Sequence, residues 1–145
     1  YNLWAPRLHH LYEEHPYGEL RHLQSNFPLS VFLCAAFNFR GSVWTFKHCD
    51  ILNFPYGWCS ITVLGRFDHH RGWGEHIASW ELKLFIQFSH AATICIPSAT
   101  ITHCSIPTSF TQFFAGGILR WVDSGFRMEK EMAQVDEILK PALMA

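Results

Sequence analysis

The feature that most constrains this fold is a series of short apolar or alternating runs, separated by turn-forming residues, that begins at Ser42. Alternation sends successive side chains to opposite faces of a strand, and Gly, Pro, Asn and Ser favour the turns between strands. Many short strands with regular punctuation are typical of a sandwich, a barrel or a jelly roll. The runs are Ser42–Phe46, Ser60–Phe67, Leu82–Phe88, Thr93–Pro97, Thr100–His103, Ser109–Phe114 and Ile118–Val122.

Helical patterns flank this β-region. Residues 8–25 carry leucines at partly helical spacing, and Pro16 and Gly18 interrupt the pattern, which favours two short helices or a helix and a loop. The apolar side chains of residues 128–139 share one face of a predicted helix. Ser30–Phe39 is apolar and of undecided type. We therefore expect a mainly β protein with flanking helices (α+β), organised as a helical flank at 1–27, a β-domain at 28–127 and a C-terminal helix at 128–145.

Composition narrows the classes of protein. With 49% apolar and 16% charged residues, the chain can build one sizeable core and is unlike a disordered segment. Its net charge is −1, whereas nucleic-acid binders usually carry a basic excess, so a contact with DNA needs a local patch. Five cysteines without a CxxC pair favour reduced thiols over a disulfide framework. The sequence contains no run of 18 apolar residues, so it does not predict a membrane span.

The residues most suited to chemistry are His48 and Asp50, together with the later His103. Residues i and i+2 of a strand point the same way, so His48 and Asp50 can reach one point in space. A second histidine from a distant strand completes a facial triad of two histidines and one carboxylate, which suits iron(II) and leaves positions open for substrate and oxygen. The alternative is structural, with His48 at a strand end, Asp50 in a turn and His103 in the core.

Other candidate metal sites compete with this triad. The pair His69-His70 lies in a predicted loop, where adjacent residues make a poor chelate and solvent exposure is the simpler interpretation. A zinc site is conceivable, although the spacings match no zinc-finger pattern; its ligands would be Cys49, Cys59, Cys104 and His103. Neither a phosphate-binding glycine loop nor a G-x-S-x-G elbow occurs in the sequence.

A set of motifs in order over Pro28 to Arg127 resembles the fungal Tet/JBP-like branch of the iron(II)- and 2-oxoglutarate-dependent dioxygenases. The motifs are Phe37–Phe39, Phe46–Asp50, Asn53–Thr62, Leu64–Asp68, Trp80–Phe88, Ile96–Ala99, His103, Ser109–Phe113 and Ala115–Trp121. Several motifs in one order are far more specific than a single HxD pair.

The resemblance implies a double-stranded β-helix, which is a jelly-roll form, with iron(II) held by His48, Asp50 and His103. It also implies oxidative decarboxylation of 2-oxoglutarate, coupled to hydroxylation of the methyl group of 5-methylcytosine in DNA. A base in a duplex must be flipped out for this reaction. Nuclear localisation follows from that substrate, and a monomer is the default expectation.

Three departures from the family pattern bear on activity. Pro107 occupies the position of the Arg that anchors the far carboxylate of 2-oxoglutarate, while the helper Ser109 is retained. Arg120, Arg66 or Arg71 is a possible substitute anchor. The segment Arg71–Trp80 is two residues longer than expected, and Ser89-His90-Ala91 lacks the usual turn glycine, which predicts strain.

Five aromatic residues are expected near the triad, where they would line a cavity, stack on a flipped base or simply pack in the core; they are Trp44, Phe46, Tyr56, Trp58 and Trp80. Three interpretations of the whole chain remain open at this point. It is an active 5-methylcytosine dioxygenase, a catalytically impaired relic of that fold, or a non-enzymatic jelly-roll binding module.

Overall fold

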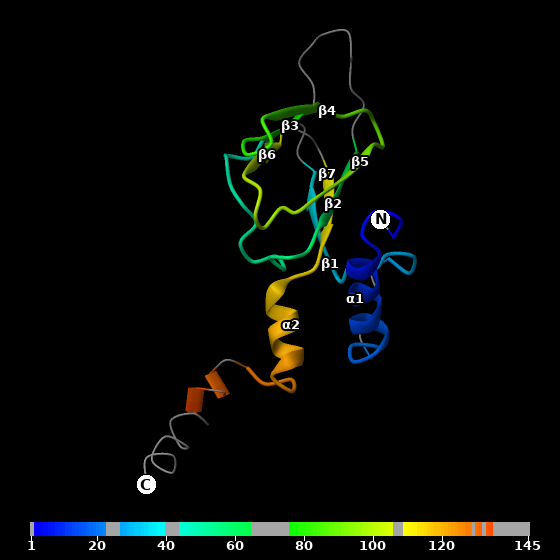
Figure 1. The fold of residues 1–145 in the computed structure, drawn as a ribbon, viewed down its shortest axis with the longest axis vertical. Helices are drawn as coiled ribbons and strands as arrows, with labels where there is room; N and C mark the ends of the chain where they lie inside the picture. The colour runs from blue at the N-terminus through cyan, green and yellow to red at the C-terminus, as the bar shows by residue number, and fades with distance from the viewer. Residues whose placement is uncertain are drawn as a thin grey trace.

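A computed structural model describes residues 2–22, 27–39, 44–64, 76–105, 109–128, 130–131 and 133–134 of the 145-residue chain. The described part is mainly β with two short helices, α1 and α2, and two antiparallel sheets (Figure 1). The elements are α1 (Pro6–Tyr17), β1 (Cys34–Asn38), β2 (Cys59–Val63), β3 (His76–Ser79), β4 (Leu84–Gln87), β5 (Thr93–Ile96), β6 (His103–Ser105), β7 (Ser109–Phe113) and α2 (Gly116–Asp123).

The two sheets draw their strands from alternating parts of the chain. The first sheet has the order β1-β7-β2-β5, and the second has the order β4-β3-β6. The five strand pairs found among the described residues are all antiparallel. An isolated antiparallel bridge between His48 and His103 adds the segment around residue 48 to the free edge of β6. Residues far apart in sequence therefore meet between the sheets.

The main core lies between the two sheets. In β2, Cys59, Ile61 and Val63 alternate inward, and Ile77 of β3 meets them from the opposite sheet. These four side chains and Phe88 are at most 5% exposed. Burial of such aliphatic and aromatic side chains stabilises a fold by roughly 1.5–3 kcal/mol each, so this cluster holds the sheets together.

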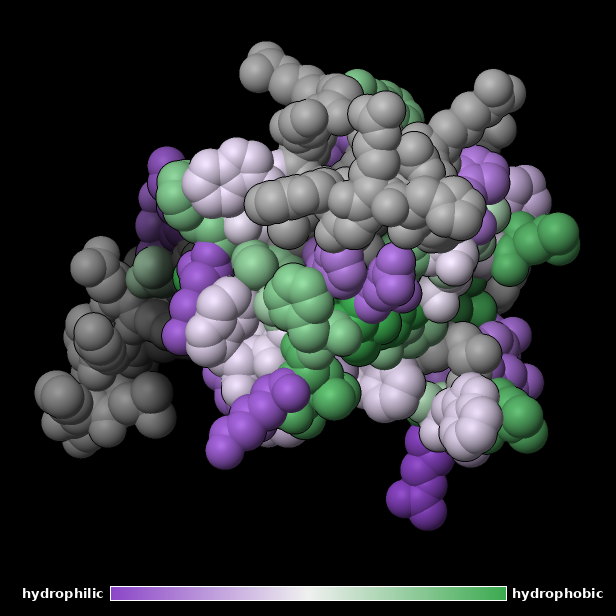
Figure 2. Space-filling view, turned by 90° about the horizontal axis from the view of Figure 1, so that it is seen from above, coloured by the Kyte–Doolittle hydropathy of each residue, from purple (hydrophilic) through white to green (hydrophobic). Residues whose placement is uncertain are grey.

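A second core joins the helices to one end of the sheets (Figure 1). The Tyr12 ring of α1 stacks on Phe114, with ring centroids 4.8 Å apart. Its hydroxyl accepts a hydrogen bond from the Trp58 backbone nitrogen at 3.2 Å and lies 3.3 Å from the Trp58 carbonyl oxygen. A Cβ on Gly57 would collide with the Tyr12 hydroxyl, which explains why a glycine precedes β2. At the end of the molecule opposite the helices, hydrophobic and hydrophilic residues are interspersed over the described surface (Figure 2).

Most predicted strands are confirmed with shifted ends. Strands β2, β4, β5 and β7 fall in predicted runs, and a helix covers much of the first predicted helical segment. The undecided segment Ser30–Phe39 contains β1. The expected strain at Ser89–Ala91 is confirmed, because Ala91 has a φ of 60°, in the left-handed region that favours glycine.

Three predictions of secondary structure are wrong. Ile118–Val122 is part of helix α2, in which Leu119 and Val122, three residues apart, are buried on one face. The prediction failed because an apolar run of this length fits either a strand or a helix. The described end of Ser42–Phe46, residues 44–46, is not in a strand, and Thr100–His103 is turn until β6 begins at His103. Most of the expected C-terminal helix lies outside the described residues. Within the described residues, the helices lack the length and apolar character needed to cross a membrane.

Candidate metal centre

One backbone pairing brings the two predicted histidine ligands together. The His48 nitrogen donates to the His103 carbonyl at 3.0 Å, and the His103 nitrogen donates to the His48 carbonyl at 2.9 Å. Directly opposed residues of an antiparallel pair project to the same face. The two imidazole rings accordingly lie with their centroids 4.5 Å apart.

Asp50 joins the histidines from the turn that follows His48. Its backbone nitrogen donates to the Ser98 carbonyl at 2.9 Å, which fixes the chain after the bridge. The carboxylate oxygens lie 3.3 Å from His48 Nε2 and 3.9 Å from His103 Nε2. One ligand atom from each of the three residues lies within 4.8 Å of the other two, so the group can hold a metal ion. The predicted convergence of the three residues is thus present.

The hydrogen bonds of the rings determine which nitrogen faces the carboxylate. His48 Nδ1 lies 2.7 Å from the Phe46 carbonyl oxygen, and His103 Nδ1 lies 2.9 Å from the Ile101 carbonyl oxygen. A carbonyl oxygen only accepts, so each Nδ1 donates a hydrogen bond, and Nε2 is the nitrogen of each ring that faces Asp50. A backbone carbonyl that anchors Nδ1 is a usual support of histidine metal ligands.

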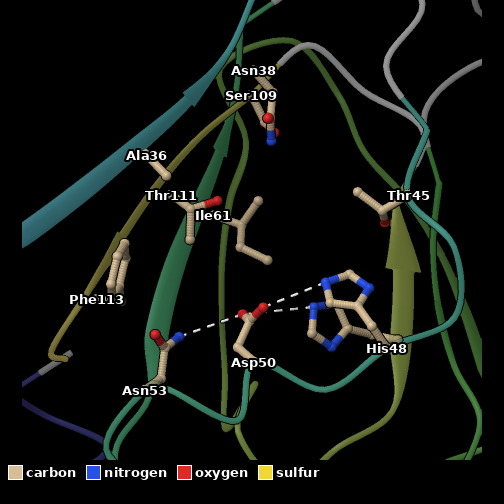
Figure 3. A pocket seen from close by; sticks show the side chains of 11 residues that line it. Ala36, Asn38, Thr45, His48, Asp50, Asn53, Ile61, Ser109, Thr111 and Phe113 are labelled. Carbon is tan, nitrogen blue, oxygen red and sulfur yellow. Dashed lines mark hydrogen bonds and ion pairs between the residues drawn. The ribbon is translucent and has the colours of Figure 1, made fainter. Parts of the chain in front are cut away.

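The triad borders a cavity of about 210 Å³ between the two sheets (Figure 3). His103 is 3% exposed, whereas the side chains of His48 and Asp50 are 38% and 30% exposed and border the opening. The inward-facing side chains of the first sheet close the opposite wall. The lining residues are Ala36, Asn38, Thr45, His48, Asp50, Asn53, Ile61, His103, Ser109, Thr111 and Phe113.

The predicted co-substrate residue Ser109 lies in this cavity, at the end away from the triad and beside Asn38 (Figure 3). These two residues are cross-strand partners of β1 and β7. Ser109 is 1% exposed, and its side chain and that of Asn38 line the cavity there. A hydroxyl and an amide both donate hydrogen bonds, so this end is suited to a polar ligand.

The candidate substitutes for the missing arginine are not brought to the cavity in the described part of the chain. Arg120 is exposed on helix α2 and is absent from the cavity lining. Arg66, Arg71 and Pro107 lie outside the described residues. Among the described lining residues, the polar side chains other than those of the triad are uncharged.

The five aromatic candidates also lie apart from the described cavity lining. Four of them are between 42% and 84% exposed and therefore neither pack in the core nor line this cavity; they are Trp44, Phe46, Tyr56 and Trp80. Trp80 instead supports a cation–π contact, with Lys47 Nζ 4.9 Å from the ring centroid.

The alternative metal sites receive no support from the described residues. All five cysteines are free, and the converging group contains no thiol. Cys49 Sγ lies 3.5 Å from Thr102 Oγ1. Burial raises the pKa of the Cys59 thiol to about 11, which disfavours the thiolate that a metal requires. His69-His70 lies outside the described residues.

Sequence reasoning did not identify the polar residues that support the ligands. Asn53 Nδ2 lies 3.4 Å from Asp50 Oδ2 and donates to Ser98 Oγ at 3.0 Å. On the outer side, Glu81 Oε2 accepts a hydrogen bond from the Thr102 nitrogen at 2.8 Å, next to His103. The hydrogen bond from the Thr102 side chain lowers the pKa of Glu81. Asn53 could have been detected in the sequence, because it lies only three positions after Asp50. Glu81 and Ser98 are brought near the triad only by the fold.

Comparison of the chain with models of known protein families, with curated proteins and with solved structures gave no match.

Proposed function

We propose that this protein is a mononuclear iron(II) oxygenase that uses 2-oxoglutarate as co-substrate and oxidises 5-methylcytosine in DNA. The observation that carries the proposal is the convergence of His48, Asp50 and His103, with Nε2 of both rings turned toward the carboxylate. The motif order that resembles Tet/JBP-like dioxygenases supplies the reaction and the substrate.

The donor set supports iron over the common alternatives. Two imidazoles and one carboxylate form the set that non-haem iron(II) oxygenases use, and three ligands from one side leave positions open toward the cavity. Iron, when bound, would supply the oxygen chemistry. The chain's own residues hold the ligands, and Ile61 and Phe113 line the space opposite with apolar surface that limits the access of water.

The strand order supports a jelly-roll interpretation of the β-domain. Beginning with β1, the chain passes from the first sheet to the bridged segment at His48 on the second sheet, and then returns with β2 to the first. The hairpin β3-β4 lies in the second sheet, and β5, β6 and β7 again alternate. Two facing antiparallel sheets connected in this way are the arrangement of a jelly roll.

The cavity offers places for both substrates. The far carboxylate of 2-oxoglutarate would accept hydrogen bonds from the Ser109 hydroxyl and the Asn38 amide, and its other end would face the triad. A methylated cytosine would have to leave the duplex to approach the metal from the open side, where His48 and Asp50 are exposed. A nuclear location and a monomer accompany this proposal.

A second candidate is a metal-binding relic that no longer turns over 2-oxoglutarate. Outside the triad the described cavity lining is uncharged, and this lining and the position of Arg120 on α2 favour the relic. Losing a charged hydrogen bond at a buried carboxylate weakens binding by roughly 2–5 kcal/mol, which is enough to lower occupancy severely.

The test is an anaerobic titration of the purified chain with iron(II) and then 2-oxoglutarate, followed in the visible region, with His48→Ala as control. A charge-transfer band that His48→Ala abolishes supports the oxygenase and justifies assays on methylated DNA. Iron binding without a band favours the relic. Absence of iron binding contradicts both candidates.

A further inference from the structure

We infer that Asn53 and Ser98 form a positioning pair that holds the Asp50 carboxylate in one orientation, with Oδ1 reserved for the metal. The inference rests on the proposed metal centre and assigns to it two residues that do not themselves bind the ion. It predicts that metal affinity depends on an amide and a hydroxyl outside the ligand set.

The two carboxylate oxygens of Asp50 have different surroundings. Oδ1 lies 3.3 Å from His48 Nε2, whereas Oδ2 lies 3.4 Å from Asn53 Nδ2 and 3.9 Å from His103 Nε2 (Figure 3). A primary amide has two N–H donors, and Asn53 directs one toward Asp50 and the other to Ser98 Oγ at 3.0 Å. An amide donor at Oδ2 competes with a metal ion for that oxygen and favours coordination through Oδ1.

Ser98 is the fixed end of this pair. It is 1% exposed, and its carbonyl accepts the Asp50 backbone hydrogen bond at 2.9 Å. The Asn53 nitrogen donates in turn to the Asp50 carbonyl at 2.8 Å, and Asn53 bridges to Ala115 near the start of α2. The backbone therefore sets the positions of Asp50, Asn53 and Ser98 independently of their side chains, and a side-chain substitution tests the pair without dismantling the turn.

The expected effect follows from general behaviour of metal sites. A carboxylate ligand that is hydrogen-bonded by a neighbouring group is already oriented before the ion arrives, and loss of such a partner typically weakens metal binding roughly 10- to 100-fold. Loss of Ser98 Oγ should act through Asn53, because the hydroxyl orients the amide rather than the carboxylate.

The experiment is a titration of the full chain with cobalt(II), a spectroscopic probe of the site, comparing Asn53→Ala, Ser98→Ala and the double variant with the unchanged chain. We expect Kd to rise at least about 10-fold for Asn53→Ala, and the double variant to add little to that because the two residues act as one unit. The visible cobalt spectrum should also change, since a carboxylate released at Oδ2 alters the coordination number. Asn2→Ala, which removes an exposed amide of the same residue type that is absent from the cavity lining, should leave Kd and spectrum unaltered.

The outcomes separate the two proposals. If the unchanged chain binds cobalt(II) and Asn53→Ala keeps its affinity and spectrum, the positioning pair is overturned and the metal centre stands. If the unchanged chain binds no cobalt(II), both are overturned. If metal-free Asn53→Ala and Ser98→Ala melt at lower temperature while their cobalt spectra stay unaltered, the pair is structural and the inference is wrong.

Discussion

The two ends of the cavity are built in opposite ways. At the triad end, both Nδ1 atoms are tied to backbone carbonyls, and Asp50 is contacted by His48 and Asn53. At the far end, Ser109 and Asn38 line the cavity as cross-strand partners of β7 and β1, and both side chains are uncharged. The first end is preorganised for an ion, and the second offers neutral hydrogen-bonding groups to a ligand. Substitutions at the two ends should therefore separate metal binding from co-substrate binding.

The largest effect is expected from the carboxylate of the triad. Asp50→Ala removes one of three ligands and should weaken the binding of iron(II) or cobalt(II) by more than the roughly 100-fold that marks the upper range for supporting residues. Asp123→Ala removes an exposed carboxylate at the end of α2 and should bind metal normally. Calorimetric titration of both variants measures this difference, and equal affinities would remove Asp50 from the site.

The buried thiol behind the triad end gives a pH dependence of stability. Burial raises the pKa of Cys59 from 9.0 to about 11, so the fold disfavours its thiolate. The stabilisation is therefore complete below pH 9 and is lost as pH rises toward 11, by roughly 2–3 kcal/mol in total. Denaturant unfolding of the metal-free protein between pH 8 and 11 should show this loss, and Cys59→Ala should lack it. Parallel pH curves for the two proteins would show that Cys59 is not the source.

Ser109→Ala tests the far end alone. Loss of one hydrogen bond to a carboxylate should weaken 2-oxoglutarate binding to the iron-loaded chain about tenfold, corresponding to roughly 1.5 kcal/mol. The affinity for iron(II) should not change, because Ser109 lies at the end of the cavity away from the triad (Figure 3). The charge-transfer band measures the first quantity and calorimetry the second. A parallel loss of both would mean that the ends are not independent.

The smallest effect is expected outside the cavity. Glu81 holds the Thr102 backbone next to His103, but its carboxylate is exposed. Glu81→Gln should change cobalt(II) affinity by less than about threefold, because solvent screens exposed charges. The same titration measures this change in affinity. A tenfold change would show that Glu81 also positions the ligands.

The sequence predicted the parts of this protein that depend on local pattern. The alternation of Cys59, Ile61 and Val63 marks β2, and the HxD spacing with a later histidine marks the triad. The run Ile118–Val122 was assigned to a strand because five apolar-rich residues fit both periods, and only its packing in α2 decides between them. Ser98 could not have been predicted, since its role arises from a contact 45 positions from Asn53.

The most direct test of the metal centre is X-ray absorption at the iron edge of the chain loaded with iron(II) without oxygen. We predict a shell of nitrogen and oxygen ligands with the outer scattering of two imidazoles, reduced to one imidazole in His103→Ala. A sulfur shell from any cysteine, or a spectrum without imidazole scattering that His103→Ala leaves unaltered, would contradict a centre built from His48, Asp50 and His103.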